Sequence, residues 1–284
     1  MIIWIASYPK SGNTWVRAIL SSLLYTEDGN FNIQHLKKID QYPIRKYFEG
    51  FVNNYHDIKE IMKYWIVTQD KLNLDNKTKF LKTHHALCKI DNFHFTNNDN
   101  TLATIYIVRD PRNLITSFTN HYSYSYDEAL KFMLYEQAAL VEKTADNDHS
   151  NFSFLNSWSN HYKSWKNNSE FETIFIKYED LENNKIEVFS KIVIFINKLL
   201  KNNNKLDEKK LINSIKSTNF SNMKNKELNE GFEESVISKK TGKKLNFFNL
   251  GFNNRYQKIL NDDLKKKMNL FFKNDLKELG YNYE

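Results

Sequence analysis

Cysteine, proline and glycine are scarce in this chain of 284 residues, which contains 1 Cys, 3 Pro and 7 Gly. The single cysteine, Cys88, excludes an internal disulfide framework and a cysteine-based zinc site. So few Gly and Pro residues argue against a loop-rich, low-complexity architecture. Hydrophobic residues make up 40% of the chain and charged residues 26%, proportions that fit a globular protein with a sizeable core. They exclude a disordered chain, a collagen-like chain and a coiled coil.

Long apolar runs are also absent. The longest after the N-terminal one, at residues 192–196, is far shorter than the ~20 residues that a membrane-spanning helix needs. The chain starts without the basic segment of a signal peptide, so we expect a soluble, cytoplasmic protein with no stable membrane insertion. No cluster of residues has the spacing of metal ligands, and we expect no metal ion. The sequence does not determine the oligomeric state.

The net charge of +7 suits an anionic ligand, an anionic surface or nucleic acid. AT-rich codon usage would give the same excess of lysine together with the abundant Asn and Ile, so the charge alone does not choose among these. No recognised nucleic-acid-binding motif is present, and we expect no nucleic-acid partner. A non-enzymatic nucleic-acid-binding protein stays an alternative, which predicts strongly salt-dependent binding to oligonucleotides.

Short apolar runs alternate with helical periodicity along the chain. The runs predict buried strands at residues 2–6, 80–82, 103–108 and 173–177. Apolar residues at helical spacing predict helices at residues 15–23, 155–165 and 186–196, with two more starting near Pro111 and Asn261. The apolar stripe of the last helix comprises Leu264, Met268, Phe271 and Leu276. This alternation predicts a single α/β domain over residues 1–284, with a central parallel sheet covered on both faces. The polar stretch 221–246 is interpreted as a mobile segment over that fold.

Residues 7–14, SYPKSGNT, lie between the first predicted strand and the first helix. A helix N-terminus offers unpaired N–H groups and the positive end of its dipole, so it binds phosphate or sulfate well. Gly12 lets the backbone approach an anion, Ser11 and Thr14 add hydroxyl donors, and Lys10 adds a positive charge. The alternative is an ordinary strand–helix turn with Lys10 in solvent.

This segment differs from the G-x-x-x-x-G-K-[ST] loop of nucleoside triphosphatases. Gly12 and Thr14 match its second Gly and its Ser/Thr. Ser7 replaces the first Gly, and Asn13 replaces the Lys that grips the β- and γ-phosphates. A nucleotide kinase or triphosphatase therefore stays an alternative that Asn13 disfavours, and it predicts magnesium-dependent ATP binding.

Residues 8–15, YPKSGNTW, resemble the 5′-phosphosulfate loop of the sulfotransferases that use 3′-phosphoadenosine 5′-phosphosulfate (PAPS). That family usually carries YPKSG[TN]TW directly after its first strand. The resemblance implies a P-loop NTPase-like three-layer α/β/α sandwich, PAPS as the donor and no required metal. It also implies that Lys10 stabilises the leaving phosphate. The implied donor-binding residues of the loop are Ser11, Gly12, Asn13, Thr14 and Trp15.

Two further motifs resemble that family in the expected order. A strand ending in Arg109, with Ser117 eight residues later, resembles the pair that holds the 3′-phosphate of PAPS. In the alternatives, Arg109 pairs with Asp110, or Asp110 is a metal-binding acid. The segment 82–84, KTH, resembles the family's general-base segment, which implies that His84 takes the proton from the acceptor. His85 is the adjacent rival.

The remaining family positions concern the adenine and the 3′-phosphate. Trp15, Tyr178, Thr218 and Phe220 match the family's adenine-binding residues in order, and aromatic faces are suited to stacking a base. The family's last motif, R-K-G-x-x-G-x-W, keeps its first glycine as Gly251. Asn249 and Leu250 replace its basic pair, for which Lys243, Lys244 or Arg255 are candidate substitutes. A sulfotransferase that binds nucleotide without catalysis stays an alternative for the same reason.

The resemblance implies in-line transfer of a sulfuryl group from PAPS to an acceptor hydroxyl or amine. In that family variable loops select the acceptor, here residues 30–78, 85–100, 120–150 and 221–246. Aromatic residues of the first and third loops line an acceptor pocket or belong to the core: Tyr42, Tyr47, Phe48, Phe51, Tyr55, His121, Tyr122, Tyr124 and Tyr126. The acceptor is a small molecule or a glycan. Polar loops and the basic charge favour a carbohydrate over a phenol or a lipid.

Overall fold

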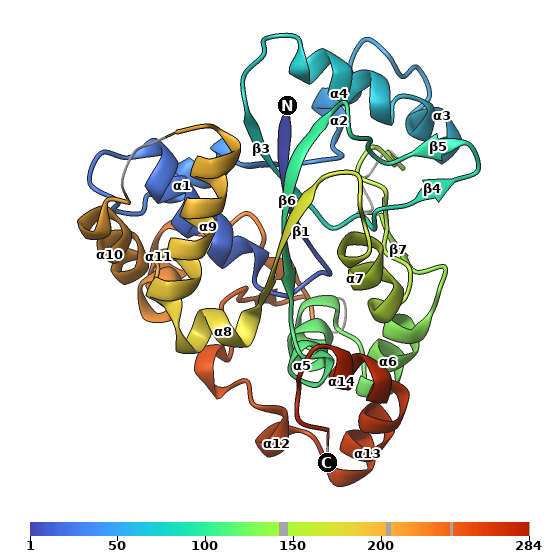
Figure 1. Ribbon diagram of the computed structural model, residues 1–284. Helices are drawn as coiled ribbons and strands as arrows, with labels where there is room; N and C mark the ends of the chain where they lie inside the picture. Colours follow the sequence, from blue (N-terminus) through green and yellow to red (C-terminus); the bar gives the residue numbers. More distant parts are fainter. Residues whose placement is uncertain (142–146, 203–205, 239–240, 284) are drawn as a thin grey trace.

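A central parallel sheet organises the protein, whose computed structural model describes residues 1–141, 147–202, 206–238 and 241–283 (Figure 1). Its strand order is β2-β3-β1-β6-β9, and every neighbouring pair is parallel. The strands are β1 (Ile2–Ser7), β2 (Asp40–Gln41), β3 (Lys79–Thr83), β6 (Thr101–Val108) and β9 (Glu172–Lys177). The four strands expected from the sequence are confirmed. The edge strand β2 was not predicted, because two residues carry no readable periodicity.

Strand β1 shows why the sheet needs cover on both faces. All six of its residues are buried. Trp4 and Ala6 enter one hydrophobic core, and Ile3 and Ile5 enter the other. Successive side chains of a strand point to opposite faces, so an unbroken apolar strand requires two apolar layers.

Helices supply both layers, as Figure 1 shows. One core is closed by α1 (Asn13–Tyr25), α9 (Lys185–Leu199) and α10 (Glu208–Ser217). The other is closed by α5 (Pro111–Tyr122), α6 (Tyr126–Leu134), α7 (Trp158–Lys166), α13 (Asp262–Phe271) and α14 (Lys273–Glu278). The predicted three-layer α/β/α sandwich is thus confirmed.

Smaller elements cover the two ends of the sheet. Near the amino ends of the strands lie α2 (Arg45–Phe48), α3 (Ile58–Lys63), α4 (Trp65–Asn73) and the hairpin of β4 (Lys89–Ile90) and β5 (Phe93–His94). The other short elements are η1 (Ile33–Lys38), β7 (Ala139–Leu140), β8 (Ser153–Phe154), α8 (Tyr178–Asn183), α11 (Phe220–Glu230), β10 (Val236–Ile237), β11 (Lys244–Leu245), η2 (Gly251–Asn253) and α12 (Tyr256–Ile259). Within the described residues, no helix is both long and apolar enough to cross a membrane.

One sequence-based expectation needs correction. The last predicted helix begins as expected, with the Asn261 side chain accepting a hydrogen bond from the Leu264 N–H, but it ends at Phe271. The chain leaves helical geometry at Phe272, which is buried, whereas Phe271 is 54% exposed. Leu276 consequently belongs to α14. The stretch 221–246, interpreted as a mobile segment, contains most of α11 and both strands of the β10–β11 hairpin.

The carboxyl edge of the sheet collects the predicted site. Because parallel strands end at the same edge, the segments after β1, β3, β6 and β9 meet there. These four segments carry the phosphate-binding turn, His84, Arg109 and Tyr178. Ligands of open parallel sheets bind outside this edge.

Candidate active site

The turn after β1 is shaped by Gly12. Its φ is +100°, in the left-handed region, and it precedes the first residue of α1. A Cβ on Gly12 would lie 2.4 Å from Cδ2 of Tyr178. Glycine is therefore required both by the backbone conformation and by the close approach of the Tyr178 ring.

Asn13 uses its side chain inside the strand–helix junction. Its Nδ2 donates to the carbonyl oxygen of Ile5 at 2.9 Å and to Oγ of Ser7 at 3.2 Å. The residue that replaces the triphosphatase lysine therefore ties α1 to β1. Only its backbone N–H, at the start of α1, is placed to serve an anion.

Several polar atoms around the turn are buried without a hydrogen-bond partner among the described residues. They include Oγ of Ser11, Nε1 of Trp15 and Nε of Arg109. A buried polar group without a partner costs about 1–3 kcal/mol, and most such groups in folded proteins are satisfied. An anionic ligand on the turn would accept hydrogen bonds from these donors, so the residues present fit a phosphosulfate nucleotide.

The Lys10 amine lies in an enclosed environment. Its Nζ is 3.4 Å from Nδ1 of His121 and 3.5 Å from the centroid of the Phe247 ring. Burial, together with the charges of Lys82 and Arg109, lowers the pKa of Lys10 to about 7, against the opposing effect of Glu234. The expectation of an ordinary turn with Lys10 in solvent does not hold.

Glu234 is a member of the site that the sequence did not reveal. Its carboxylate accepts hydrogen bonds from Oγ1 of Thr14 at 2.6 Å and from Nη1 of Arg17 at 2.7 Å. Nζ of Lys82 donates to the same carboxylate at 3.1 Å. Although burial raises it, the pKa of Glu234 lies well below its usual range because of Lys82 and Arg17. The Thr14 hydroxyl, which was predicted to bind the donor, is therefore already hydrogen-bonded to an anion, the Glu234 carboxylate.

The imidazole of His84, the candidate base, is neutral. Its Nδ1 lies 2.8 Å from the carbonyl oxygen of Ser7. Because a carbonyl only accepts, Nδ1 carries the proton and the lone pair of the neutral ring is on Nε2. Burial and the charge of Lys82 lower the pKa of His84 well below its ordinary value. The imidazole is therefore in the form that can accept a proton.

The rival histidine lies in the aromatic core. The His85 ring stacks on Phe95 at a centroid distance of 4.1 Å, and its Nδ1 is 2.7 Å from the carbonyl oxygen of Ala86. Burial lowers the pKa of His85 to about 3. This environment favours a packing role for His85.

A second buried histidine fixes the backbone at His84. Nε2 of His161 donates to the carbonyl oxygen of His84 at 2.9 Å, and its Nδ1 accepts from the hydroxyl of Tyr106 at 2.7 Å. These two hydrogen bonds link Tyr106 of β6 to His161 of α7 and then to the backbone of His84, so they hold the candidate base in place. Sequence analysis missed His161, because its helical spacing marks it only as a core position.

Arg109 and Ser117 come together as predicted. Nη1 of Arg109 donates to the carbonyl oxygen of Lys10 at 3.0 Å and to Oγ of Ser117 at 3.4 Å. Asp110 does not pair with Arg109. Its two oxygens instead accept from Nε and Nη2 of Arg112 at 2.9 and 2.7 Å. The Asp110 carboxylate is already paired with Arg112. The structure therefore supports neither an ion pair between Asp110 and Arg109 nor a metal-binding role for Asp110.

The predicted adenine residues fall into two groups. The rings of Trp15 and Tyr178 meet edge to face at 6.0 Å, beside the Arg109 guanidinium. Phe220 packs on Gly251, where a Cβ would lie 2.7 Å from its ring. Lys185 links the groups, since its Nζ is 5.9 Å from the centroid of Trp15 and 5.4 Å from that of Phe252. The hydroxyl of Thr218, at the end of α10, donates to the carbonyl oxygen of Ser214.

Residues 2–280 match the family model described as Sulfotransferase domain. The chain belongs to the sulfotransferase family. Luciferin sulfotransferase of Photinus pyralis is 24% identical over 229 residues, which are 78% of this chain and 56% of that protein. Sulfotransferase 1B1 of Canis lupus familiaris is 26% identical over 229 residues, which are 80% of this chain and 67% of that protein. The chain thus spans little more than half the length of the first relative.

Solved structures agree on the fold. The crystal structure of retinol dehydratase in a complex with retinol and PAP matches with a TM-score of 0.58 and 17% identity, over 97% of this chain and 81% of that one. At this identity the likeness concerns the fold alone. It agrees with the three-layer arrangement around the parallel sheet.

This sulfotransferase-family chain departs from the family's last motif, as the sequence showed. Asn249, Leu250, Lys243 and Lys244 are exposed, and Nη1 of Arg255 donates to Glu182 at 2.6 Å. Asn254 is the residue of this motif that reaches the candidate 3′-phosphate pair. Its Nδ2 donates to Oγ of Ser117 at 3.0 Å and to the carbonyl oxygen of Asn113 at 2.9 Å. The sequence signal that could have identified Asn254 is its position within this motif.

The aromatic residues proposed for an acceptor pocket mostly belong to the core. Tyr42 and Phe48 are fully buried in it, and Tyr122 packs on Phe118 at 4.5 Å. His121, beside the Lys10 amine, is the clearest exception. Residues 142–146 and 239–240 of the acceptor loops lie outside the described residues.

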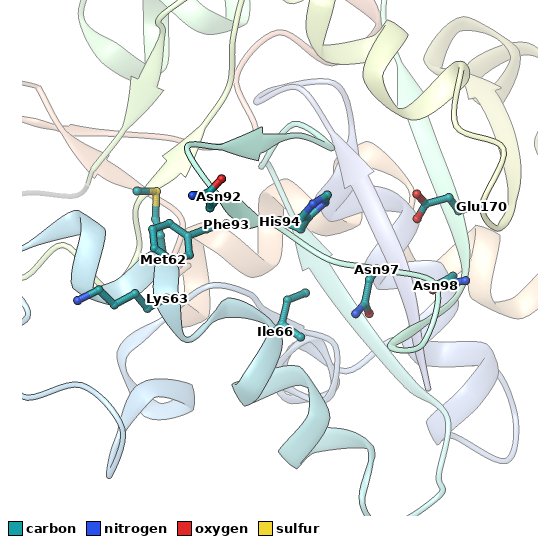
Figure 2. Close-up of a pocket in the computed structure, with 9 residues that line it drawn as sticks. All are labelled: Met62, Lys63, Ile66, Asn92, Phe93, His94, Asn97, Asn98 and Glu170. Carbon is teal, nitrogen blue, oxygen red and sulfur yellow. The ribbon is translucent and has the colours of Figure 1, made fainter.

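A surface cavity of about 480 Å³ lies elsewhere, between α3, α4 and the β4–β5 hairpin (Figure 2). None of the predicted site residues lines it. Its lining includes three asparagines, Asn92, Asn97 and Asn98, together with His94 and Glu170. The candidate active site is therefore defined by its side chains and not by this cavity.

Proposed function

We propose that the protein transfers a sulfuryl group from PAPS to the hydroxyl or amine of an acceptor. The observation that carries this proposal is the bridge made by Arg109. Its guanidinium contacts both the Lys10 carbonyl of the phosphate-binding turn and the Ser117 hydroxyl. A nucleotide with a 5′-anhydride on the turn would thus have its 3′-phosphate within reach of Arg109 and Ser117. Buried donors on Ser11 and Arg109 support an anionic ligand there.

The proposed chemistry assigns one task to each residue. His84 accepts the acceptor's proton on Nε2 as the acceptor oxygen or nitrogen bonds to sulfur. The bond between sulfur and the bridging oxygen breaks, and the electron pair leaves with the 5′-phosphate. Protonated Lys10 and the N–H groups at the start of α1 stabilise the charge on that phosphate. Holding both partners in line supplies much of the remaining rate gain.

The acceptor is proposed to be a small molecule. Luciferin sulfotransferase and a retinol dehydratase solved with retinol and PAP are similar to this chain. These names support a low-molecular-weight acceptor and a donor related to PAP. The preference for a carbohydrate stays a sequence-based prediction.

The broader organisation is part of the same proposal. The family match over residues 2–280 supports a single domain over residues 1–284. A cytoplasmic location and the absence of a nucleic-acid partner stay predictions. Cell fractionation and titration with an oligonucleotide at two salt concentrations would check them.

The test begins with nucleotide binding. We expect PAP to bind without magnesium in calorimetric titrations, and ATP with magnesium to bind more weakly. Binding of magnesium–ATP in preference to PAP would instead support a kinase or triphosphatase. The second step follows transfer from sulfur-labelled PAPS to a panel of phenols, alkyl alcohols and amines.

The His84→Ala variant tests the role of the base. General-base catalysis contributes typically about 10²–10⁴-fold, so turnover should fall by that factor while PAP binding is retained. His85→Ala tests the rival histidine: because His85 packs in the core the change should lower stability, but the folded variant should keep its turnover. Full turnover in a folded His84→Ala protein would contradict the assignment.

A further inference from the structure

The carboxylate of Glu234 occupies a site built for an anion. Two cations and one hydroxyl donate to its oxygens, from Arg17, Lys82 and Thr14, at 2.7, 3.1 and 2.6 Å. The side chains of Arg17 and Lys82 are each 7% exposed, and that of Glu234 is 25% exposed. A phosphate or sulfonate oxygen receives the same kind of charge-assisted hydrogen bonds.

The three donors come from the elements that face the reaction centre. Thr14 lies in the first turn of α1, directly after the phosphate-binding turn. Lys82 lies in β3, two residues before His84. Arg17 is one helical turn beyond Thr14, so its side chain lies on the same face of α1. The donor's 5′-phosphosulfate and the Glu234 carboxylate would therefore require the same hydrogen-bond donors.

We propose that Glu234 is an internal competitor for the donor and so determines which anions bind. In the donor-free protein its carboxylate binds Thr14, Arg17 and Lys82, and an incoming donor displaces it. A singly charged anion offers no more than the carboxylate it must displace, whereas a phosphosulfate nucleotide adds contacts with the turn and with Arg109. This inference rests on the proposed function for the identity of the nucleotide, but not for the competition itself.

The surroundings of Glu234 allow it to be displaced. Glu233, next to it, pairs with Lys37 at 2.6 Å, but both side chains are largely exposed. Exposed ion pairs of this kind contribute little to stability. On the other side, Oγ of Ser235 donates to the buried Glu227 at 2.5 Å.

Glu227 also anchors the far end of the segment. Its carboxylate accepts from the backbone N–H groups of Phe247 and Phe248 at 2.6 and 2.9 Å. The segment after α11 is thus fastened at Ser235 and at residues 247–248. Glu234 lies beside the first of these anchors, so its side chain can leave the site without release of the segment.

A purely structural role makes the opposite prediction. If Glu234 instead orients Arg17 and Lys82 for the donor, removing its charge weakens donor binding. If it competes, removing its charge strengthens binding, because the apparent dissociation constant is the intrinsic one divided by the fraction of molecules with the site open.

The experiment compares Glu234→Gln with Glu233→Gln. The control removes one carboxylate from the adjacent, exposed position, so it has the same net charge. Each protein is titrated calorimetrically with PAP and, separately, with inorganic pyrophosphate at fixed pH and ionic strength. We expect Glu234→Gln to bind both ligands about tenfold more tightly than the wild type, and Glu233→Gln to match the wild type. Equal or weaker binding by Glu234→Gln would overturn the proposal.

Two further measurements keep the outcome decisive. Glu234→Asp shortens the side chain and so weakens the competing contacts. We expect this variant to bind both ligands more tightly than the wild type does. The test therefore remains possible if Glu234→Gln fails to fold. Unchanged or weaker binding by Glu234→Asp would also overturn the proposal. Pyrophosphate separates the two hypotheses. Tighter pyrophosphate binding without any PAP binding would support the competition and contradict PAPS as the donor. PAP binding of equal strength in all variants would support PAPS as the donor and contradict the competition.

Discussion

Donor binding should take up a proton, because Lys10 has an unusual pKa. Burial and the neighbouring cations lower the pKa of Lys10 to about 7 in the donor-free protein. A phosphate beside the amine favours its charged form and raises the pKa again. At pH 8.5 only about 3% of the free protein carries this proton, so binding must recruit nearly a whole proton. Donor affinity should accordingly fall as the pH rises above 7.

The size of this effect follows from linkage. If Lys10 stays fully protonated in the complex up to pH 9, the dissociation constant of PAP should rise about 50-fold between pH 7 and pH 9. The phosphate groups of PAP do not interfere in this window, since their second pKa is about 6. His121, the neighbour of the amine, does not interfere either, because burial and Lys10 lower the pKa of His121 to about 3.

Calorimetry measures the proton directly. PAP is titrated at pH 8.5 in two buffers of different ionisation enthalpy, and the difference in observed heat gives the number of protons taken up. Lys10→Arg is the control, because a guanidinium stays charged throughout and should abolish both the uptake and the pH dependence. A wild-type protein that takes up no proton and binds equally at pH 7 and pH 9 would refute the reasoning.

Three further outcomes follow from the geometry. Gly12→Ala should lower the free energy of unfolding by about 1–3 kcal/mol in urea denaturation, because its φ is +100° and its Cβ would meet the Tyr178 ring at 2.4 Å. Arg112→Met should cost about 3–5 kcal/mol in the same assay, because it leaves the buried Asp110 carboxylate without its cation. The acid limb of the transfer rate should lie below pH 6.5, because the pKa of His84 is lowered and its base form is lost only as the pH falls through that value.

Each of these has a control or a contradicting result. Gly50→Ala introduces a Cβ at a φ of +82° with no atom within 4 Å, so it isolates the backbone strain from the clash. Equal losses for the two glycine variants would contradict the close approach of the tyrosine ring. Lys191→Met breaks an exposed pair with Glu187 and should change stability by less than about 0.5 kcal/mol. A transfer rate that already falls when the pH is lowered to 7 would contradict the neutral state of His84.

The sequence predicted the parts of the site that depend on local pattern. The first strand is apolar throughout, and the turn after it carries Gly12 where the backbone must adopt a positive φ. Pro111 begins the next helix as expected, since a proline suits the first turn, and the structure adds Asp110 as its cap. Neighbouring residues decide these features, so a single sequence contains the necessary information.

The sequence could not predict contacts between distant segments. Thr14 and Glu234 are 220 residues apart, and Arg17 and Glu234 are 217 apart. Glu234 lies in a polar stretch where no periodicity singles it out. Similarly, an apolar spacing of four could not distinguish Phe271 from Phe272, because the break between α13 and α14 depends on how both helices pack.

The Glu234 competition and the Lys10 proton share an electrostatic cause, which gives a final prediction. Glu234 raises the pKa of Lys10, whereas Lys82 and Arg109 lower it. Glu234→Gln removes the larger of the two acidic charges that act on Lys10 and leaves only that of Glu227, so the pKa of Lys10 should fall below about 7. At pH 7 the wild type should take up about half a proton on binding PAP, and the variant clearly more than half. Uptake that is unchanged in Glu234→Gln would mean that the carboxylate does not act on the Lys10 amine, even if the variant binds PAP more tightly.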